Sequence, residues 1–260
     1  MNADKPSVSL ITVTQYSRRT CLENLICLIN EQIYENICEW VIVEGSKNPA
    51  DAEANSQLIA IHQKNKMVFP INIVYIPYQT NPSQRHLSDY RNAGNQKCTG
   101  DIIVCMDDDD YYPPTRVSHA VFSLSNSTAL IAGCSQAYIY FYLHNKFLQF
   151  KSFGKNHSTN NCMAYKRAYL ESHAHAPGLD KAEESHFTNN YTAPMVQLNP
   201  NKCIVVSGHG YNTVDKNWLC EVPSAPGKKY MVNRLTTEVI TEQIPFAVLD
   251  RMKGIFLKMF

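Results

Sequence analysis

The sequence predicts an α/β fold in which a mixed, mainly parallel sheet is flanked by helices, with a smaller antiparallel region in the second half of the chain. Three observations lead to this fold class. Short, nearly continuous apolar runs alternate with helical patterns in the first half, as expected for parallel strands buried on both faces. The runs end in polar residues, and the second half carries shorter and less regular segments.

The first half contains four expected strands separated by helices. Residues 22, 25, 26 and 29 are apolar at the spacing of one helix face. The expected strands cover residues 7–13, 40–43, 71–76 and 101–106, and the expected helices cover residues 22–29, 50–64 and 88–96. In a sheet of this type, ligands bind where the loops converge at the carboxyl ends of the strands.

The second half is predicted to be largely antiparallel. No glycine- or serine-rich linker separates it from the first half, which favours one continuous domain. The expected strands cover residues 130–131, 137–143, 147–150 and 203–207, and helices are expected near residues 166–172 and 181–190.

Composition restricts the possible functions. The 260 residues include 24 Lys and Arg against 23 Asp and Glu, a net charge of +1, and 44% are hydrophobic. This composition excludes a disordered chain, and the lack of a cationic excess argues against a nucleic-acid partner. Nine cysteines without Cys-x-x-Cys spacing, and no apolar stretch of signal-peptide or membrane-spanning length, predict a cytoplasmic protein.

Four consecutive aspartates, Asp107 to Asp110, follow the strand expected at 101–106. Adjacent carboxylates repel one another unless positive charge lies among them, and carboxylate oxygens are suitable ligands for Mg²⁺ or Mn²⁺. The run therefore predicts a divalent metal site at the sheet edge, with an acidic surface turn as the alternative. A P-loop is excluded because the sequence has no G-x-x-x-x-G-K-[ST] motif.

The run is the last of five ordered motifs, which are SVSLITVTQYSRR, LENLICLINEQ, EWVIVEGS, the helix containing RNAG, and the strand ending in MDDDD. Together they resemble the family 2 glycosyltransferases of the GT-A fold. The resemblance implies a GT-A domain over residues 1–230, with a nucleotide-binding half at about 7–120 and an acceptor half at about 121–230, followed by a helical segment at 231–260. It also implies a nucleotide-sugar donor, usually a UDP-sugar, and Mn²⁺ or Mg²⁺. The acceptor, whether glycan, protein or small molecule, is left open.

The resemblance assigns donor-binding roles to four residues of the first half. Tyr16, with Thr14 beside it, matches the aromatic residue that lies against the base, although an ordinary loop tyrosine is the alternative. Glu44 matches the carboxylate that accepts the uracil N–H. Arg91 is expected to hold the base or a phosphate, or else to pair with Asp89.

Within the acidic run, the resemblance implies that Asp109 binds the metal ion, while Asp107 and Asp108 contact the ribose and orient the ligands. Asp110 is expected just behind them. His209, which lies between two glycines after an expected strand, resembles the late histidine that completes the metal shell in some GT-A enzymes. A solvent-facing loop histidine is the alternative.

The expected catalytic base lies in the Asp180-Lys-Ala-Glu-Glu segment. An inverting sugar transfer needs a carboxylate to accept the proton of the acceptor hydroxyl. By resemblance, Glu184 is the base and Glu183 its supporting partner. The alternative is that both acids simply favour a helix N-terminus.

The C-terminal segment repeats apolar residues at helical spacing after Pro245, with basic residues opposite. This pattern predicts a helix that packs on its own domain or, alternatively, contacts a membrane surface reversibly. Two other functions remain open for the chain as a whole. A sugar-phosphate nucleotidyltransferase would carry an early G-x-G-T-R-like loop, which is absent after the first strand, and a catalytically silent nucleotide-sugar-binding module would retain only the sheet.

Overall fold

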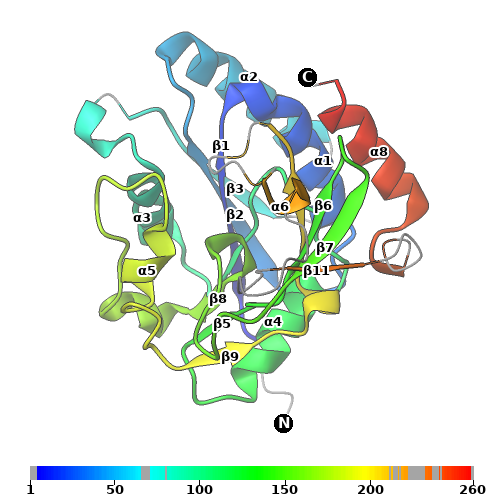
Figure 1. Cartoon of the computed structure of the whole chain (residues 1–260). Coiled ribbons are helices and arrows are strands. Elements are labelled where there is room, and N and C mark those ends of the chain that lie inside the picture. The colour runs from blue at the N-terminus through cyan, green and yellow to red at the C-terminus, as the bar shows by residue number, and fades with distance from the viewer. Residues whose placement is uncertain are drawn as a thin grey trace.

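The computed structural model describes residues 5–65, 71–79, 81–210, 212, 216, 218–221, 232–235, 240 and 242–258. Its strands form two sheets that lie side by side, with helices around the larger one (Figure 1). The larger sheet has seven strands in the order β3-β2-β1-β4-β8-β5-β9, and the smaller has four in the order β10-β6-β7-β11. The predicted α/β class with a mainly parallel sheet is confirmed for the first half of the chain.

The first four strands run parallel, as their apolar runs predict. Their side chains alternate between the two faces of the sheet, so that Leu10 packs with one buried cluster and Ile11 with another. Helices α1, α2 and α4 contribute to the first cluster and α3 and α5 to the second. The elements are β1 (Val8–Thr14), α1 (Arg19–Asn30), β2 (Ile37–Glu44), α2 (Pro49–Asn65), β3 (Asn72–Ile76), α3 (Leu87–Lys97), β4 (Ile102–Cys105), α4 (Arg116–Ser125) and α5 (Glu183–Phe187).

Helix α3 lies unusually close to the sheet at Gly94. A Cβ atom added there would lie 2.5 Å from Cδ1 of Ile11 and 3.0 Å from Cγ2 of Val43. The glycine of the RNAG motif therefore allows the close approach that brings Arg91, one turn earlier, to the end of β4.

Beyond β4 the direction of the sheet changes. Strand β8 (Ala164–Lys166) runs antiparallel to both β4 and β5 (Ile131–Gly133), and β9 (Met195–Gln197) pairs parallel with β5. The segment expected as a strand near residue 130 therefore belongs to the main sheet. Strands β8 and β9 were not predicted, because three residues are too short to show an alternating pattern.

The smaller sheet is mixed rather than purely antiparallel. Strands β6 (Tyr138–Phe141) and β7 (Lys146–Phe150) form the expected hairpin and β11 (Val232–Arg234) adds antiparallel to β7, but β10 (Val205–Gly208) pairs parallel with β6. Tyr111 and Val205 exchange backbone hydrogen bonds of 3.1 and 2.9 Å. This pair ties the residue after the acidic run to β10, and so brings the chain around His209 to the end of β4.

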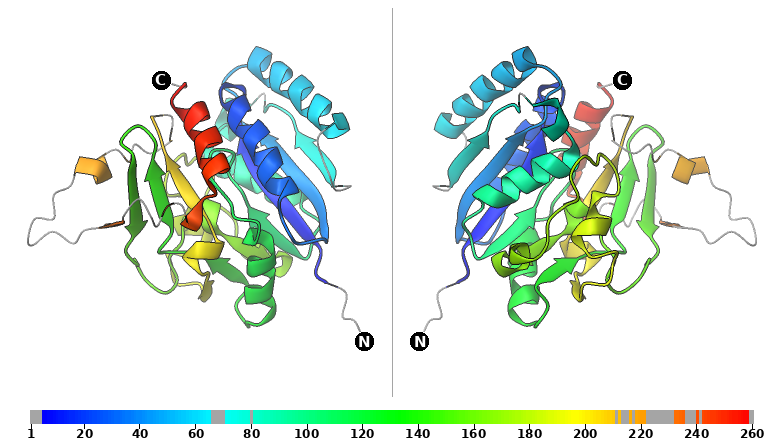
Figure 2. Two further views of the ribbon diagram at one scale, coloured as in Figure 1. Left: turned by 90° about the vertical axis from the view of Figure 1, so that its right-hand side faces the viewer. Right: turned by 90° about the vertical axis from the view of Figure 1, so that its left-hand side faces the viewer.

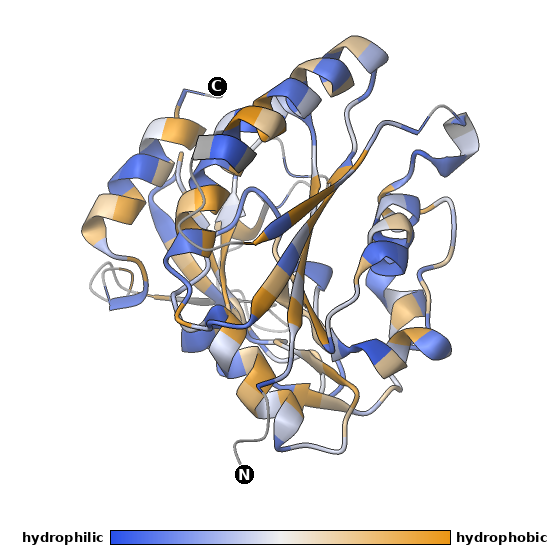
Figure 3. Cartoon of the chain, turned by 180° about the vertical axis from the view of Figure 1, so that it is seen from behind, coloured by the Kyte–Doolittle hydropathy of each residue, from blue (hydrophilic) through white to orange (hydrophobic). Residues whose placement is uncertain are grey.

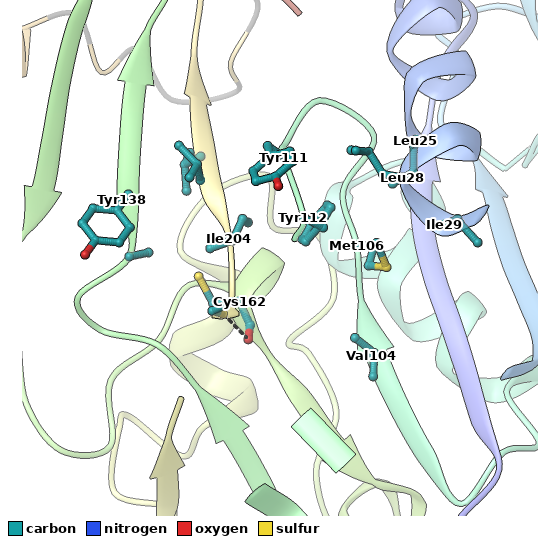
Figure 4. Close-up of a cluster of buried hydrophobic side chains, with 14 of the residues drawn as sticks. Leu25, Leu28, Ile29, Val104, Met106, Tyr111, Tyr112, Tyr138, Cys162 and Ile204 are labelled. Carbon is teal, nitrogen blue, oxygen red and sulfur yellow. Dashed lines mark hydrogen bonds between the residues drawn. The ribbon is translucent and has the colours of Figure 1, made fainter. Parts of the chain in front are cut away.

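A continuous apolar core lies between helix α1, the end of β4 and strand β10 (Figure 4). Leu25, Leu28 and Met106 pack there with the fully buried Tyr112. The hydroxyl of Tyr112 accepts a hydrogen bond of 2.6 Å from the backbone N–H of Asp107, which fixes the turn where the acidic run begins. Seen from behind, the strands in the interior are mainly apolar, and the outer faces of the helices are mainly polar (Figure 3).

Helix α8 (Phe246–Phe256) packs beside α1 (Figure 2). Its apolar face, made of Val248, Leu249, Met252 and Phe256, is buried against the protein. The packing alternative therefore accounts for the apolar pattern that also suggested membrane contact, while Phe246 at the start of this helix and Leu257 just after its end are exposed. No helix in the described part of the chain is long and apolar enough to cross a membrane.

Candidate active site

Two adjoining hollows lie at the carboxyl ends of β1 and β4. We call the first, of about 520 Å³, the wide hollow, and the second, of about 180 Å³, the acidic hollow because six carboxylic acids line it. They share Val13, Arg18, Leu87 and Asp180 in their walls. A larger hollow of about 1080 Å³ lies around Asp101 and Arg167, at the other end of β4 and away from these acids.

The side chains of the acidic run do not all face the same space. Asp107, Asp109 and Asp110 line the acidic hollow, whereas Asp108 is fully buried and accepts a hydrogen bond of 2.7 Å from the hydroxyl of Thr14. Burial raises the pKa of Asp108 to about 7. The structure therefore places Asp108 against Thr14 and Arg18, and the ribose contact expected for Asp108 stays a prediction.

Arg18 is the main residue of the site that the sequence analysis did not identify. Its guanidinium lies 2.8 Å from Oδ2 of Asp109 and 3.1 Å from Oδ1 of Asp108. Burial alone would raise the pKa of Asp109, but Arg18 and the hydrogen bond from His209 together hold that pKa below its usual range. The available signal was the Ser-Arg-Arg sequence directly after the first strand.

His209 is brought to Asp109 across 100 residues of sequence, with 3.1 Å between its Nε2 and Oδ2 of the carboxylate. Two neighbouring ligands of an ion with bonds of about 2.1 Å lie roughly 3.0 Å apart, so this carboxylate–imidazole pair fits a divalent cation completed by phosphate and water. Among the residues described, no group of three or more His, Cys, Asp or Glu side chains converges on one point. The stacking of the His209 ring on Phe256, at 4.6 Å between centroids, fixes its orientation.

Arg91 joins the two halves of the site. Its guanidinium makes two hydrogen bonds of 3.1 Å to Asp107, and its Nε makes a third of 3.1 Å to Glu183. Asp89 instead accepts the backbone N–H of His86 at the start of α3, so the alternative pairing of Arg91 with Asp89 is wrong. Arg91 thus positions the acidic run relative to helix α5.

The adjacent acids of α5 occupy different environments. Glu183 is buried and also accepts a hydrogen bond of 3.1 Å from Asn160. Glu184 lines the acidic hollow and forms no ion pair with any described residue. Burial, followed by the charge of Glu183, raises the pKa of Glu184 to about 7. Ala182, which precedes the helix, has a left-handed backbone with φ of 54°, a conformation that costs about 1–2 kcal/mol in a non-glycine residue.

Two expected donor-binding residues, Thr14 and Glu44, lie at or next to the wide hollow. Thr14 lines that hollow, and its hydroxyl donates a hydrogen bond to Asp108. Glu44 is fully buried, and its oxygens accept hydrogen bonds from the backbone of Ser46 and from Asn55 and Tyr75. These contacts hold Glu44 next to Ser46 in the wall of the hollow, and the base contact expected for Glu44 stays a prediction.

The ring of Tyr16 lies beneath the guanidinium of Arg19, 4.9 Å from it, and is not among the side chains that line the wide hollow. Instead, Tyr90, Leu87 and Val13 form its apolar wall. Tyr90 was not predicted as a site residue, because within the RNAG helix it follows the pattern of an ordinary core position.

Asn160 and Asn161 complete the acidic hollow. Asn161 donates a hydrogen bond of 2.7 Å to Asp110, whose other oxygen accepts the backbone N–H of Ser207 at 2.8 Å. Burial, followed by the charge of Asp109, raises the pKa of Asp110. Asp110 therefore anchors the acidic run to the second half of the chain.

The family model described as Glycosyl transferase family 2 matches residues 10–182. The chain belongs to glycosyltransferase family 2. It is thus a member of a family of glycosyl-transferring enzymes, as the five sequence motifs suggested. Among curated proteins no sequence matches it significantly.

Solved structures support the fold of this family 2 chain. The mannosyltransferase PcManGT from Pyrobaculum calidifontis, in complex with GDP-Man and Mn²⁺, is 15% identical with a TM-score of 0.60, over 99% of this chain and 72% of its own. Residues 1–349 of S. aureus TarS, in complex with UDP-GlcNAc, are 15% identical with a TM-score of 0.58, over 80% of this chain. The match spans only 60% of that TarS structure. At these identities the likeness shows the GT-A fold.

Proposed function

We propose that the chain transfers a sugar from a UDP-sugar to an acceptor hydroxyl, with inversion at the anomeric carbon and with the help of Mn²⁺ or Mg²⁺. The observation that carries this proposal is the acidic hollow, which is lined both by Asp109, whose carboxylate is hydrogen-bonded to the imidazole of His209, and by Glu184, whose pKa is raised. The S. aureus TarS complex with UDP-GlcNAc supports a uridine donor, and the PcManGT complex with GDP-Man and Mn²⁺ supports metal use.

The wide hollow would hold the nucleoside, and the acidic hollow the diphosphate and sugar. Asp109 and His209 would bind the divalent cation, which supplies positive charge to the departing diphosphate. Asp107 is held toward the acidic hollow by Arg91, and the charges of Arg18 and Lys216 there attract phosphate oxygens.

Glu184 would act as the base. With a pKa of about 7, its carboxylate can accept the proton of an acceptor hydroxyl near neutral pH, because general bases work best when their pKa lies near the operating pH. Glu183, held by Arg91 and Asn160, fixes the helix that carries it.

We further propose that the transferase machinery lies within residues 1–230, whereas residues 231–260 support it through β11 and α8. A cytoplasmic location is supported by the nine cysteines, none of which is paired in a disulfide. The acceptor can be a glycan, a protein or a small molecule, and the exposed apolar residues Phe246, at the start of α8, and Leu257, just after its end, leave room for a peripheral membrane contact.

The decisive experiment compares Glu184→Gln with the parent in a nucleotide-release assay, using UDP- and GDP-sugars with Mn²⁺. We expect Glu184→Gln to lower turnover by about 10²–10⁴-fold while the affinity for UDP with Mn²⁺ stays within twofold. Glu171→Gln is the matched control, since Glu171 is an exposed acid outside both hollows. Unchanged turnover in Glu184→Gln would refute the base assignment, and NMR of the product anomer tests inversion.

A further inference from the structure

Arg18 is paired with Asp109, the carboxylate proposed to bind the metal ion. It ends a short 3₁₀ helix (Tyr16–Arg18) directly after β1, and its side chain is only 15% exposed. Its guanidinium reaches both Asp108 and Asp109. Arg18 is also one of the four residues that line both hollows. The side chain therefore lies at the junction between the proposed nucleoside and phosphate sites.

The metal ion and Arg18 compete for the same atom. Oδ2 of Asp109 accepts the hydrogen bond from Nη1 of Arg18 at 2.8 Å and also faces Nε2 of His209 at 3.1 Å. A divalent ion placed between Asp109 and His209 would put two positive charges beside the guanidinium. Because like charges in a partly desolvated site repel strongly, one of the two cations has to leave Asp109.

The guanidinium keeps a hydrogen-bond donor that its present contacts do not use. Nε of Arg18 is buried and has no hydrogen-bond partner among the residues described, so the present contacts leave part of its donor fork unused. Arginine presents planar, paired donors that match phosphate oxygens. Arg91, the neighbouring arginine, differs because all three of its nitrogens are committed to Asp107 and Glu183.

From these contacts we infer that Arg18 is the resident counter-cation of the acidic edge. It neutralises Asp108 and Asp109 in the empty enzyme, a divalent ion displaces it, and the displaced guanidinium then binds the donor diphosphate. This inference rests on the proposed metal-dependent transfer. Its consequence is coupled binding, in which the metal ion binds weakly alone and tightly with a nucleoside diphosphate, because only the diphosphate provides a new partner for Arg18.

The experiment measures Mn²⁺ affinity from the EPR signal of the free ion, with and without UDP, for the parent, Arg18→Gln and Arg19→Gln. Arg19→Gln is the matched control, since it removes the same charge from the adjacent, exposed residue. Without nucleotide, we expect Arg18→Gln to bind Mn²⁺ about tenfold more tightly than the parent, and Arg19→Gln to match the parent. The tightening of Mn²⁺ binding by UDP should be large in the parent and several-fold smaller in Arg18→Gln.

The outcomes separate this inference from the proposed function. If the parent binds Mn²⁺ with UDP but Arg18→Gln binds Mn²⁺ alone no more tightly than the parent, the counter-cation role is refuted and metal-dependent transfer stands. If neither the parent nor any variant binds Mn²⁺ with UDP or GDP, metal dependence is refuted, and this inference is refuted as well. If circular dichroism shows that Arg18→Gln folds poorly, Arg18→Lys tests the counter-cation role in its place. A lysine keeps the charge without the fork, so its Mn²⁺ affinity alone should fall between those of the parent and the tenfold-tighter variant, and an affinity no higher than the parent's would refute the role.

Discussion

On the proposed donor side of the acidic hollow, Asp107 and Asp109 leave the end of β4, whose neighbour β1 pairs with it in parallel register from Val8 to Ile11. On the proposed acceptor side, Glu184 stands on a five-residue helix with left-handed residues before and after it, Ala182 at φ 54° and Asn189 at φ 50°. The first arrangement is built from regular backbone hydrogen bonds. The second contains a left-handed alanine, a conformation that costs about 1–2 kcal/mol locally.

The difference implies that the acceptor side is held in place by its contacts with the donor side. Arg91 reaches Glu183 from α3, and His86 pairs with Asp180 at 3.0 Å. Asn92 exchanges hydrogen bonds of 2.9 Å with the backbone of His175, which precedes helix α5 in the chain. Helix α3 therefore positions the proposed base relative to the acidic run, and changes in α3 should affect both sides.

The largest effect is expected from Arg91→Met. Removal of this buried guanidinium leaves the carboxylates of Asp107 and Glu183 without their partner, which costs about 3–5 kcal/mol of unfolding free energy for a buried ion pair. Urea denaturation measures it. Arg85→Met is the control, because Arg85 lies over the ring of Tyr78 at 4.6 Å and donates a hydrogen bond of 2.8 Å to the carbonyl of Gln79, and these contacts contribute only about 0.5–1 and 0.5–1.5 kcal/mol. Equal losses in the two variants would contradict the bridging role of Arg91.

Gly94→Ala tests the close packing of α3 against the donor side. The new Cβ would lie 2.5 Å from Cδ1 of Ile11, so we expect a net loss of about 2 kcal/mol, from overpacking less the gain in helix propensity. The double variant with Ile11→Val removes that Cδ1 and should recover about half of the loss. A Gly94→Ala variant as stable as the parent would show that α3 shifts freely on the sheet.

Sequence reasoning succeeded where structure is local. The apolar runs of β1, β2 and β4 and the helix periodicity of α1 come from residues a few positions apart, and the acidic run follows directly from one of these strands. The pairing of His209 with Asp109 was expected only through the family resemblance, since 100 residues separate them.

The remainder depends on long-range contacts that no short pattern records. Glu44 looks like a ligand residue in sequence, but Asn55 and Tyr75, from the neighbouring helix and strand, engage it internally. Arg18 looks like a surface residue after a strand, and only the fold brings it to Asp108 and Asp109. Strands β8 and β9 exist because the main sheet offers them partners, not because their three residues favour extended structure.

A smaller effect, with a defined pH dependence, is expected from Glu184→Gln on stability. The pKa of Glu184 is raised from 4.5 to about 7 in the folded chain, so the folded state binds this proton more tightly than the unfolded state. The stabilisation from this proton is complete below pH 4.5 and is lost as the pH rises toward 7. Glutamine does not titrate, so the variant should equal the parent near pH 4.5 and exceed it by about 1 kcal/mol at pH 8, after allowance for partial exposure.

Urea titrations at the two pH values measure this difference, with Glu171→Gln as the surface control. Parent turnover should rise in parallel as Glu184 loses its proton, and fall about tenfold for each pH unit below 7. A stability difference that does not change between pH 4.5 and pH 8 would mean that the pKa of Glu184 is that of an ordinary glutamate. Glu184 would then be unsuited to act as the base.

Gly254→Ala should have the smallest effect and the opposite sign from Gly94→Ala. Gly254 lies inside α8 on its exposed side, and an added Cβ meets no atom within 4 Å. Alanine favours the helix over glycine by about 0.5–1 kcal/mol, so the unfolding free energy should rise by that amount. Phe256 of α8 stacks on the ring of His209. Since a more stable helix keeps this contact, Mn²⁺ affinity should be unchanged. A loss of stability would show that α8 is not docked along its whole length, and that the orientation of His209 has another cause.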